Sequence, residues 1–384
     1  MTDQLENDSE DLPEQIAVRM AKREKLNDLS DAYPVSLPIT HTISEVRAEF
    51  PELEIDVATG KNVAVAGRVV FARNTGKLCF ATLQSGDGER IQAMVSLDKV
   101  GEESLEQYKE LVDLGDHLFV EGEVITSKRG ELSILVSSWK MAAKTIRPLP
   151  NLHNDLSEEF RVRHRYIDLI VRDRAREVVK IRSQVMQSLR KTFAEDSYLE
   201  VETPMLQSMH GGASARPFKT HMNAFDMELF LRIAPELFLK RAVVGGLERV
   251  FEINRNFRNE GADSTHSPEF AMLESYQAYG DYNTMAELTQ KLIQNAAQDV
   301  FGTQVVKIED GEENDLSGSW DRISMFESLS AAAGVEITPD TPMAELKKIA
   351  DKVEIEIDHP LHGKYVEELW EHFVKPGLKT PTFV

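Results

Sequence analysis

Two kinds of hydrophobic spacing divide the chain. Across residues 63–136, five short runs rich in Val, Ile, Leu and Phe alternate with turn sequences such as NTGK and SGDGER. A helical stretch, EESLEQYKELVDL, lies between the third and fourth runs. Five short strands with a helix after the third is the order of an OB-fold, a small β-barrel often used to bind oligonucleotides. A β-barrel without that function has the same pattern.

Outside this region the apolar spacing is mainly helical. Residues 13–30 have helical composition, and after RPLP at 147–150 apolar residues recur three or four positions apart at Val178, Ile181, Val185 and Leu189. That spacing predicts an amphipathic helix over 172–193. An extended segment at YLEVETPML, a strand at MELFLRI and a helix starting at Pro235 are predicted next. Further helices are predicted around 283–300 and 364–374, with a loop-rich, partly acidic region between them.

The stretch 249–276 has the pattern of two strands joined by a polar loop. In FEINRNFRNEG, alternation places Phe251 and Phe257 on a core face, and Glu252, Arg258 and Glu260 on a charged face. After GADSTHSP, the run EFAMLESY alternates again and puts Phe270, Met272, Glu274 and Tyr276 on one face. If the strands pair as a hairpin, the two polar faces coincide. Such a face suits a flat, charged ligand.

Composition narrows the class of protein. The length of 384 residues is enough for two or three domains, and the 41% hydrophobic content is ordinary for a globular protein. No apolar run approaches the roughly 20 residues of a membrane helix, and the N-terminus is polar, so we expect a cytoplasmic protein without a membrane segment. The single cysteine, Cys79 in KLCFATL, is predicted to be a buried structural thiol. The sequence contains no CxxC or HExxH arrangement of the kind that indicates a metal site.

Charge bears on possible polyanionic partners. The net charge of -21 argues against nucleic acid as a partner, although a local basic surface can override the sum. Residues 1–14 contain six acidic side chains and no Lys or Arg, which predicts a disordered acidic tail. The stretch 161–191 is richer in Lys and Arg than in Asp and Glu. A charge-rich amphipathic helix explains that stretch as well as RNA contact does.

From about residue 13 onward the sequence resembles the class II aminoacyl-tRNA synthetases, most closely the bacterial lysyl-tRNA synthetases. VETPML matches the first class II motif, and FEINRNFRNEG with HSPEFAMLESY matches the second. FRNE followed by PEF is typical of the aspartyl, asparaginyl and lysyl subgroup, and GGASARPF with RIAPELFLKR selects the lysyl member. The resemblance implies an α+β fold, with an N-terminal OB-fold β-barrel followed by an antiparallel class II sheet flanked by helices. The implied organisation is an acidic tail (1–14), a helical extension (15–60), an anticodon-binding OB-fold domain (61–146), a linker (147–165) and a partial catalytic domain (166–384).

The reaction implied by the resemblance joins lysine to ATP and then transfers it to tRNA(Lys). Such phosphoryl chemistry depends mainly on positioning and charge stabilisation. A planar guanidinium can bridge a carboxylate and an α-phosphate, so Arg258 is the implied catalytic residue. The implied ATP-binding residues are Arg258, Glu260, His266 and Phe270. Many relatives carry an arginine immediately before this histidine, where the present chain has Thr265.

Free lysine presents two ammonium groups and one carboxylate, so its site needs carboxylates. The implied lysine-binding residues are Gly212, Glu236, Arg258, Glu274 and Tyr276. Considered alone, Glu274 could instead pair with Arg258 across the hairpin. In the barrel, the positions that match the family's anticodon contacts are Phe80, Gln92 and Glu131, although Phe80 alone would be a core residue.

In the family, the segment reached at KTPTFV leads into a third class II motif with Mg ligands and more of the lysine pocket. We therefore expect the chain to be a fragment or a truncated product that does not activate lysine at a normal rate. ATP and Mg are the implied cosubstrate and cofactor. Lysine, tRNA(Lys) and a second copy bound through the first-motif helix are the implied partners. The alternatives are a catalytically impaired RNA-binding module and a lysylating paralogue that modifies a translation factor. An aspartyl enzyme would need cations in place of Glu236 and Glu274.

Overall fold

The computed structural model describes residues 12–150, 156–263, 265–307, 311, 313–357 and 360–384. The chain forms two compact units, Met1–Val178 and Val179–Val384, and each is described by itself. Most of the acidic tail predicted over 1–14 lies outside the described residues, and its last three residues begin the first helix. The predicted domain boundaries stay predictions.

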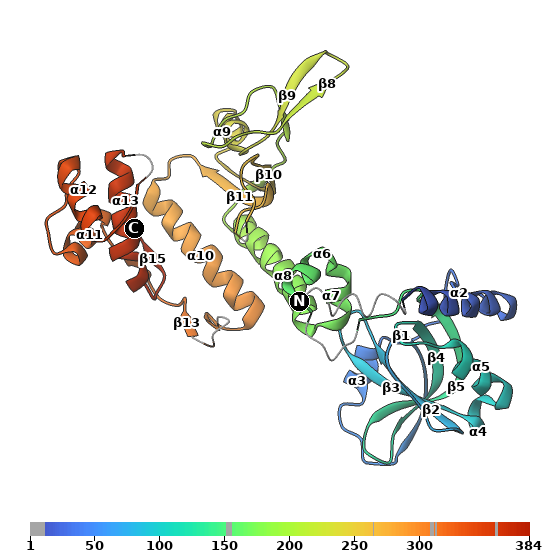
Figure 1. Cartoon of the computed structure of the whole chain (residues 1–384). Coiled ribbons are helices and arrows are strands. Elements are labelled where there is room, and N and C mark those ends of the chain that lie inside the picture. Colours follow the sequence, from blue (N-terminus) through green and yellow to red (C-terminus); the bar gives the residue numbers. More distant parts are fainter. Residues whose placement is uncertain (1–11, 151–155, 264, 308–310, 312, 358–359) are drawn as a thin grey trace. The chain divides into compact units, whose positions relative to one another are not determined.

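The first unit is built on a closed five-stranded barrel with strand order β1-β2-β3-β5-β4 (Figure 1). All neighbouring strands are antiparallel except β3 and β5, and the helices α4 and α5 lie between β3 and β4 in the sequence. This arrangement confirms the predicted OB-fold. Its elements are α2 (Leu12–Leu29), α3 (Ile43–Glu49), β1 (Ala58–Asn74), β2 (Leu78–Gln84), β3 (Arg90–Ser96), α4 (Leu97–Val100), α5 (Glu102–Leu111), β4 (His117–Thr126) and β5 (Leu132–Ala143), followed by α6 (Glu158–Arg163) and α7 (Arg165–Val171).

Alternate side chains of the barrel strands fill its core. Val65, Leu83 and Ile134 are fully buried there, together with Cys79. Burial raises the pKa of the Cys79 thiol, and the predicted burial of this cysteine is confirmed. At Gly122, where the β4–β5 register shifts, a Cβ atom would lie 2.1 Å from the carbonyl oxygen of Leu135. Only glycine lets the two backbones approach this closely.

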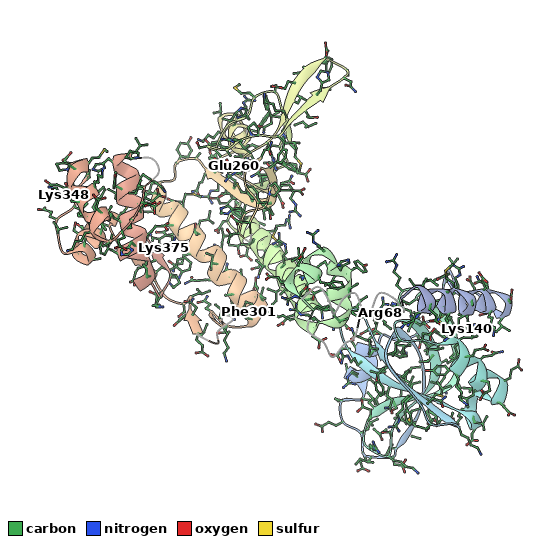
Figure 2. The ribbon with its side chains drawn as sticks, in the orientation of Figure 1. Arg68, Lys140, Glu260, Phe301, Lys348 and Lys375 are labelled. Atoms are coloured by element: carbon green, nitrogen blue, oxygen red, sulfur yellow. The ribbon has the colours of Figure 1, made fainter. Side chains whose placement is uncertain are left out.

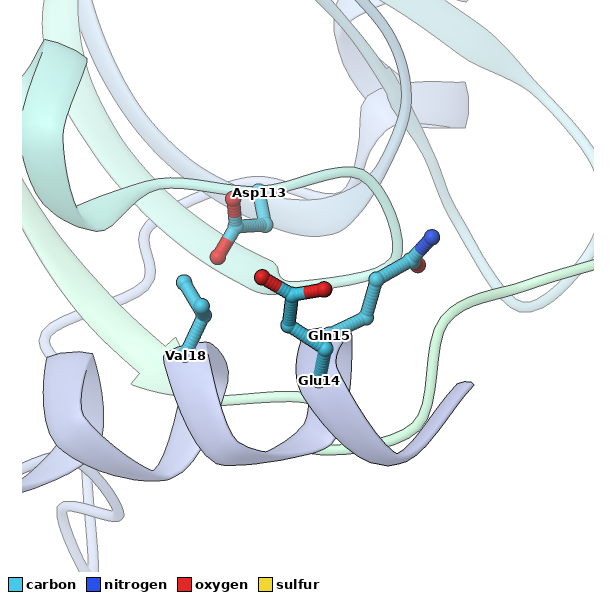
Figure 3. Close-up of a pocket in the computed structure, with 4 residues that line it drawn as sticks. All are labelled: Glu14, Gln15, Val18 and Asp113. Atoms are coloured by element: carbon cyan, nitrogen blue, oxygen red, sulfur yellow. The ribbon is translucent and has the colours of Figure 1, made fainter. Parts of the chain in front are cut away.

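A buried ion network connects α2 to the barrel. The Lys144 ammonium lies 2.7 Å from Asp116 and 2.5 Å from Asp113, and Lys22 of α2 lies 2.6 Å from Asp113. A pocket beside α2, lined by Glu14, Gln15, Val18 and Asp113, lies next to this network (Figure 3). Because Asp113 already pairs with two lysines, its carboxylate offers a ligand in this pocket little free charge.

The second unit contains two small three-stranded sheets at the position of the motifs. One has strand order β11-β10-β6, with β6 parallel to β10, and the other has order β7-β9-β8. The helix α8 spans the division between the two units. The elements from there onward are α8 (Asp173–Glu195), β6 (Leu199–Glu200), β7 (Leu206–Gln207), β8 (Lys219–Met222), β9 (Met227–Leu231), α9 (Glu236–Val244), β10 (Arg249–Phe257), β11 (Glu269–Gln277), α10 (Tyr282–Phe301), β12 (Val305–Lys307), β13 (Glu313–Asp315), β14 (Asp321–Arg322), α11 (Met325–Ala333), α12 (Met343–Lys352), α13 (His362–Phe373), η1 (Lys375–Gly377) and β15 (Thr382–Phe383).

The core face predicted for β10 packs against α8 and α10. The ring of Phe251 stacks on Phe193 of α8 at 4.1 Å between centroids, and Leu288 and Leu292 of α10 join the same cluster. The apolar stripe predicted on α8 is only partly buried, since Val178 is 41% exposed. No helix in the described part of the chain is long and apolar enough to cross a membrane.

The region predicted to be loop-rich contains two helices, α11 and α12, so that prediction was wrong. They pack with α13 around a second core that includes Leu329, Leu346, Val366 and Leu369. Both helices are short, at nine and ten residues, and short helices are stabilised mainly by tertiary packing. Local periodicity is therefore weak evidence for them.

Candidate active site

The register of β10 and β11 decides which side chains share the polar face of the hairpin. Glu252 lies opposite Glu274, and Asn256 lies opposite Phe270. Arg258 follows β10 directly, and its N–H donates to the carbonyl oxygen of Pro268 at 2.9 Å. The pairing therefore continues through Arg258. The predicted row of Arg258, Phe270 and Glu274 lies on one face.

Arg258 contacts a predicted adenine-stacking residue and has no counter-ion in the described part of the chain. The centre of its guanidinium lies 5.1 Å from the ring centroid of Phe270. Its Nε atom is buried without a hydrogen-bond partner among the described residues. The alternative pairing with Glu274 is not formed, because Glu274 accepts a hydrogen bond from Tyr276 instead. A buried donor without a partner is costly, so this guanidinium fits an anionic ligand.

Glu252 shares the polar face with Glu274, as predicted, but its carboxylate is engaged by Arg232 and is not open to a ligand. Its side chain and that of Arg232 are each 1% exposed, and they form an ion pair of 2.7 Å. The hydroxyl of Thr203 donates to the second carboxylate oxygen of Glu252 at 2.6 Å. Arg232 follows strand β9 in the apolar run MELFLRIA, where a lone arginine is a signal of a buried pair. The partner of that arginine could not be inferred from spacing.

Gly212 and Glu236 are brought together. Gly212 has a φ of +87°, and a Cβ atom there would lie 2.7 Å from the Cβ of Glu236 and 3.4 Å from its Oε2. Glu236 is the first residue of α9, where the helix dipole favours a carboxylate. The backbone at Gly212 therefore lies directly beside a carboxylate at a helix N-terminus.

Glu274 and Tyr276 extend this negative cluster. The Tyr276 hydroxyl donates to Glu274 at 2.6 Å. Burial raises the pKa of Glu274, and the charge of Glu236 raises it further. Burial, the bond to Glu274 and the charge of Glu236 also raise the pKa of Tyr276. Two carboxylates and a phenol that influence one another in this way form a site for cationic groups.

The loop after β10 is joined to the GGASARPF segment. The Asn259 N–H donates to the carbonyl oxygen of Arg216 at 2.8 Å, and the Arg216 N–H donates to Glu260 at 3.3 Å. Glu260, labelled in Figure 2, is exposed, as is the Arg216 side chain. The sequence did not predict the contact between Arg216 and Glu260, because these residues are 44 positions apart and the backbone N–H of Arg216 makes the bond.

His266 and Thr265 are held by Asp263. The Nδ1 atom of His266 lies 2.9 Å from an Asp263 oxygen, and the Thr265 hydroxyl donates to the same carboxylate at 2.8 Å. These hydrogen bonds hold the pKa of Asp263 well below its usual range. Within the described residues, His266 makes no hydrogen bond or ring contact with Arg258 or Phe270. It is the one predicted ATP residue that the structure ties to its own loop.

In the barrel, the predicted anticodon residues Phe80 and Gln92 share one face of neighbouring strands, and Glu131 directly precedes β5. Thr82 of β2 lies opposite Gln92 of β3, so Phe80, two residues earlier in β2, is on the same face as Gln92. The Ser133 hydroxyl donates to Gln92 at 3.0 Å and lies 2.9 Å from the carbonyl oxygen of Glu131. Phe80 is only partly buried and lies outside the barrel core, so its alternative assignment to the core was wrong.

Two further residues at this face were missed. The guanidinium of Arg73 lies 5.3 Å from the Phe80 ring centroid, and Ser133 links Gln92 to Glu131. Arg73 lies opposite Phe80 in the β1–β2 register, a relation that the strand pattern could have revealed. The described residues contain no group of three or more His, Cys, Asp or Glu side chains that could hold a metal ion.

Comparison with known families agrees with both halves of this description. Residues 157–377 match the tRNA synthetases class II (D, K and N), and residues 63–142 match the OB-fold nucleic acid binding domain. The two domains are therefore those of a class II synthetase with an OB-fold anticodon-binding barrel.

The relatives narrow this class. A lysine–tRNA ligase of Kineococcus radiotolerans is 60% identical over 387 residues, which covers 100% of this chain and 77% of that protein. Lysine–tRNA ligase 1 of Mycobacterium tuberculosis H37Rv is 55% identical, over 98% of this chain and 76% of its own length. A lysylphosphatidylglycerol biosynthesis bifunctional protein of Mycolicibacterium vanbaalenii is 44% identical, over 99% of this chain and 34% of its own length. The chain belongs to the lysine–tRNA ligase family of class II synthetases.

Proposed function

We propose that the chain activates lysine with ATP and transfers the lysyl group to tRNA(Lys). The observation that carries this proposal is the guanidinium of Arg258, which lies on Phe270 in the row that continues to Glu274 and whose Nε is buried without a partner among the described residues. An anion-binding group next to a cation-binding cluster matches the charges of lysine and ATP. The reaction needs these groups fixed in advance rather than a strong protein base.

In this proposal Arg258 bridges the lysine carboxylate and the α-phosphate of ATP. Both contacts use the planar donor geometry of a guanidinium. Phe270 stacks on adenine, and Glu260 and His266 contact the nucleotide. Arg216 takes the terminal phosphates in place of the arginine that many relatives carry at position 265, because its backbone is joined to this loop and its side chain is exposed.

Lysine selection is assigned to the negative cluster. Glu236 and the backbone of Gly212 hold the α-ammonium, and Glu274 with Tyr276 holds the ε-ammonium. A neutral or acidic amino acid brings no cation to the partly buried Glu274 carboxylate, which is costly. The hydrogen bond from Tyr276 orients that carboxylate in the free protein.

The barrel face is assigned to the anticodon. Phe80 stacks on a splayed base, and Gln92 and Glu131 hydrogen-bond to base edges. Arg73 fixes the Phe80 ring and contributes positive charge to a chain that is acidic overall. Local charge of this kind is sufficient for an acidic enzyme to bind RNA.

Mg and a second copy of the chain complete the proposal. Bound Mg would neutralise charge on the phosphates of ATP, and no residue of the described part is assigned to it. We place the dimer contact on the first-motif segment around α8, where Val178, Val179 and Leu199 are exposed. The reaction takes place where tRNA and ATP are found, in the cytoplasm.

The test is the binding of a non-hydrolysable lysyl-adenylate analogue to the full chain, measured by calorimetry, together with lysine-dependent ATP–pyrophosphate exchange. R258M is expected to weaken analogue binding about 100-fold, because a charge-assisted bidentate contact is lost. The matched control is R255M. Arg255 is an exposed arginine on the same strand that lies 3.7 Å from Glu269. Equal affinities for R258M and R255M would reject the assignment.

The two alternatives predict different results. An RNA-binding module would retain an anticodon stem-loop but would not bind the adenylate analogue. A paralogue that lysylates a translation factor would form the adenylate but would not charge tRNA(Lys). The closed barrel with Phe80 and Gln92 on one face favours tRNA as the acceptor.

A further inference from the structure

An ammonium group of the chain itself contacts the proposed lysine site. The Lys240 Nζ atom lies 2.7 Å from Oε1 of Glu236 and 5.7 Å from the ring centroid of Tyr276. Glu236 is assigned to the α-ammonium of the substrate and Tyr276 to its ε-ammonium. Lys240 therefore occupies contacts that belong to the ligand.

An ordinary surface ion pair does not explain both contacts. Glu and Lys four residues apart on a helix commonly pair for a small gain. Glu371 at the end of α13 and Lys375 at the start of η1 form a pair of the same spacing at 3.0 Å, and the Lys375 side chain is 59% exposed, close to the 57% of Lys240. Lys240 differs because its second partner, Tyr276, comes from β11 and not from its own helix. A cation over an aromatic face is a specific interaction.

The charge of the cluster gives Lys240 a role. Glu236 and Glu274 repel each other electrostatically, and both Lys240 and Arg232 favour the ionised form of Glu274. Arg232 is fully buried and committed to Glu252, so it cannot leave. The Lys240 side chain is exposed enough to move into solvent. Of these two cations, only Lys240 can be exchanged for a ligand.

We propose that Lys240 is the resident counter-ion of the empty lysine pocket and that the substrate displaces its ammonium from Glu236. This inference rests on the proposed function, because it takes Glu236 as the α-ammonium ligand. The resident cation keeps Glu236 and Tyr276 in place before binding. It also competes with lysine, so the affinity of the pocket for lysine is lower than its carboxylates alone would give.

If Lys240 competes with the substrate, removing its ammonium should raise the affinity for lysine. Replacing Lys240 by methionine removes the competitor but keeps most of the side-chain volume. K240M is expected to bind lysine up to about fivefold more tightly than the wild-type chain, the size expected for release of one exposed ion pair. K240R retains the cation and should bind lysine with wild-type affinity. A residue with a merely structural role would weaken binding when it is lost.

Isothermal titration of the full chain with lysine separates the outcomes, and far-UV circular dichroism checks that each variant is folded. The matched control is K375M, which removes a pair of the same spacing and exposure (Lys375 is labelled in Figure 2). K375M should leave lysine affinity unchanged. Equal or weaker lysine binding by K240M would overturn the role of Lys240 while wild-type binding still supports the proposed function. A wild-type chain that binds no lysine, with E236Q identical to it, would reject the proposed function itself.

Discussion

The replacement of Gly212 by alanine tests the lysine pocket with the smallest possible change. The added methyl carbon would lie 2.7 Å from the Cβ of Glu236 and 3.3 Å from the Cβ of Ala234. Carbon atoms in contact lie about 3.5–4.0 Å apart, so Glu236 and the loop must separate by roughly 1 Å. The φ of +87° adds backbone strain, because only glycine adopts this region at low cost.

The size of the G212A effect follows from the displacement of Glu236 and from the backbone strain. A displacement of about 1 Å in a group that positions a substrate can lower catalytic efficiency about 100-fold. The strain of a left-handed alanine costs roughly 1–2 kcal/mol of stability. We therefore expect G212A to weaken lysine binding about 100-fold while the chain stays folded. Calorimetric titration with lysine measures the first effect, and urea denaturation measures the second.

Gly246 provides a matched control. It also has a positive φ, at +101°, but an added Cβ would have no neighbour within 4 Å. G246A should show similar strain and should bind lysine as the wild-type chain does. If G212A bound lysine within about threefold of G246A, Gly212 would not lie against the lysine site, and the assignment of Glu236 would fail with it.

Three other predictions follow from the geometry. R232M should destabilise the sheet by about 3–5 kcal/mol, because it leaves the Glu252 carboxylate buried without its cation. Hydrogen exchange of β10 and β11 peptides measures this loss of stability, and unchanged exchange would contradict a buried pair. F80A should weaken binding of an anticodon stem-loop by about 1–3 kcal/mol in a filter assay, whereas F301A, at a residue 50% exposed at the end of α10, should not. Because the pKa of Glu274 is raised in the folded chain, the contribution of this residue to stability falls as pH rises from the usual carboxyl range to the raised value. Lysine binding needs the ionised carboxylate, so lysine affinity should rise over the same pH interval. The lysine affinity of E274Q should not change over that interval.

Much of the fold could be predicted because its signals are local. Alternation over β2, β3, β10 and β11 has a period of two residues, and it identified the barrel order and the shared face of Arg258 and Phe270. Turn sequences and the helix between the third and fourth strands indicated the OB-fold. The helices α11 and α12 were missed because they depend on packing against α13 rather than on their own periodicity.

The same alternation could not separate one charged residue from another. Glu252 and Arg258 lie on the same predicted face, yet Glu252 is enclosed with Arg232 and Arg258 keeps a buried nitrogen free of any partner in the described residues. The partner of His266 could not be predicted from the sequence either, because its contact with Asp263 depends on how the loop folds.

The sequence by itself determined which residues share a strand face or a motif, because strand faces and motifs are properties of neighbouring positions. Only the tertiary structure decided their charge states and partners. The energy of a charged group depends on burial and on counter-ions supplied by other elements. Arg232 reaches Glu252 from the end of β9, and Lys240 reaches Tyr276 from α9. Neither contact is a property of one segment, so neither could be inferred until the chain was folded.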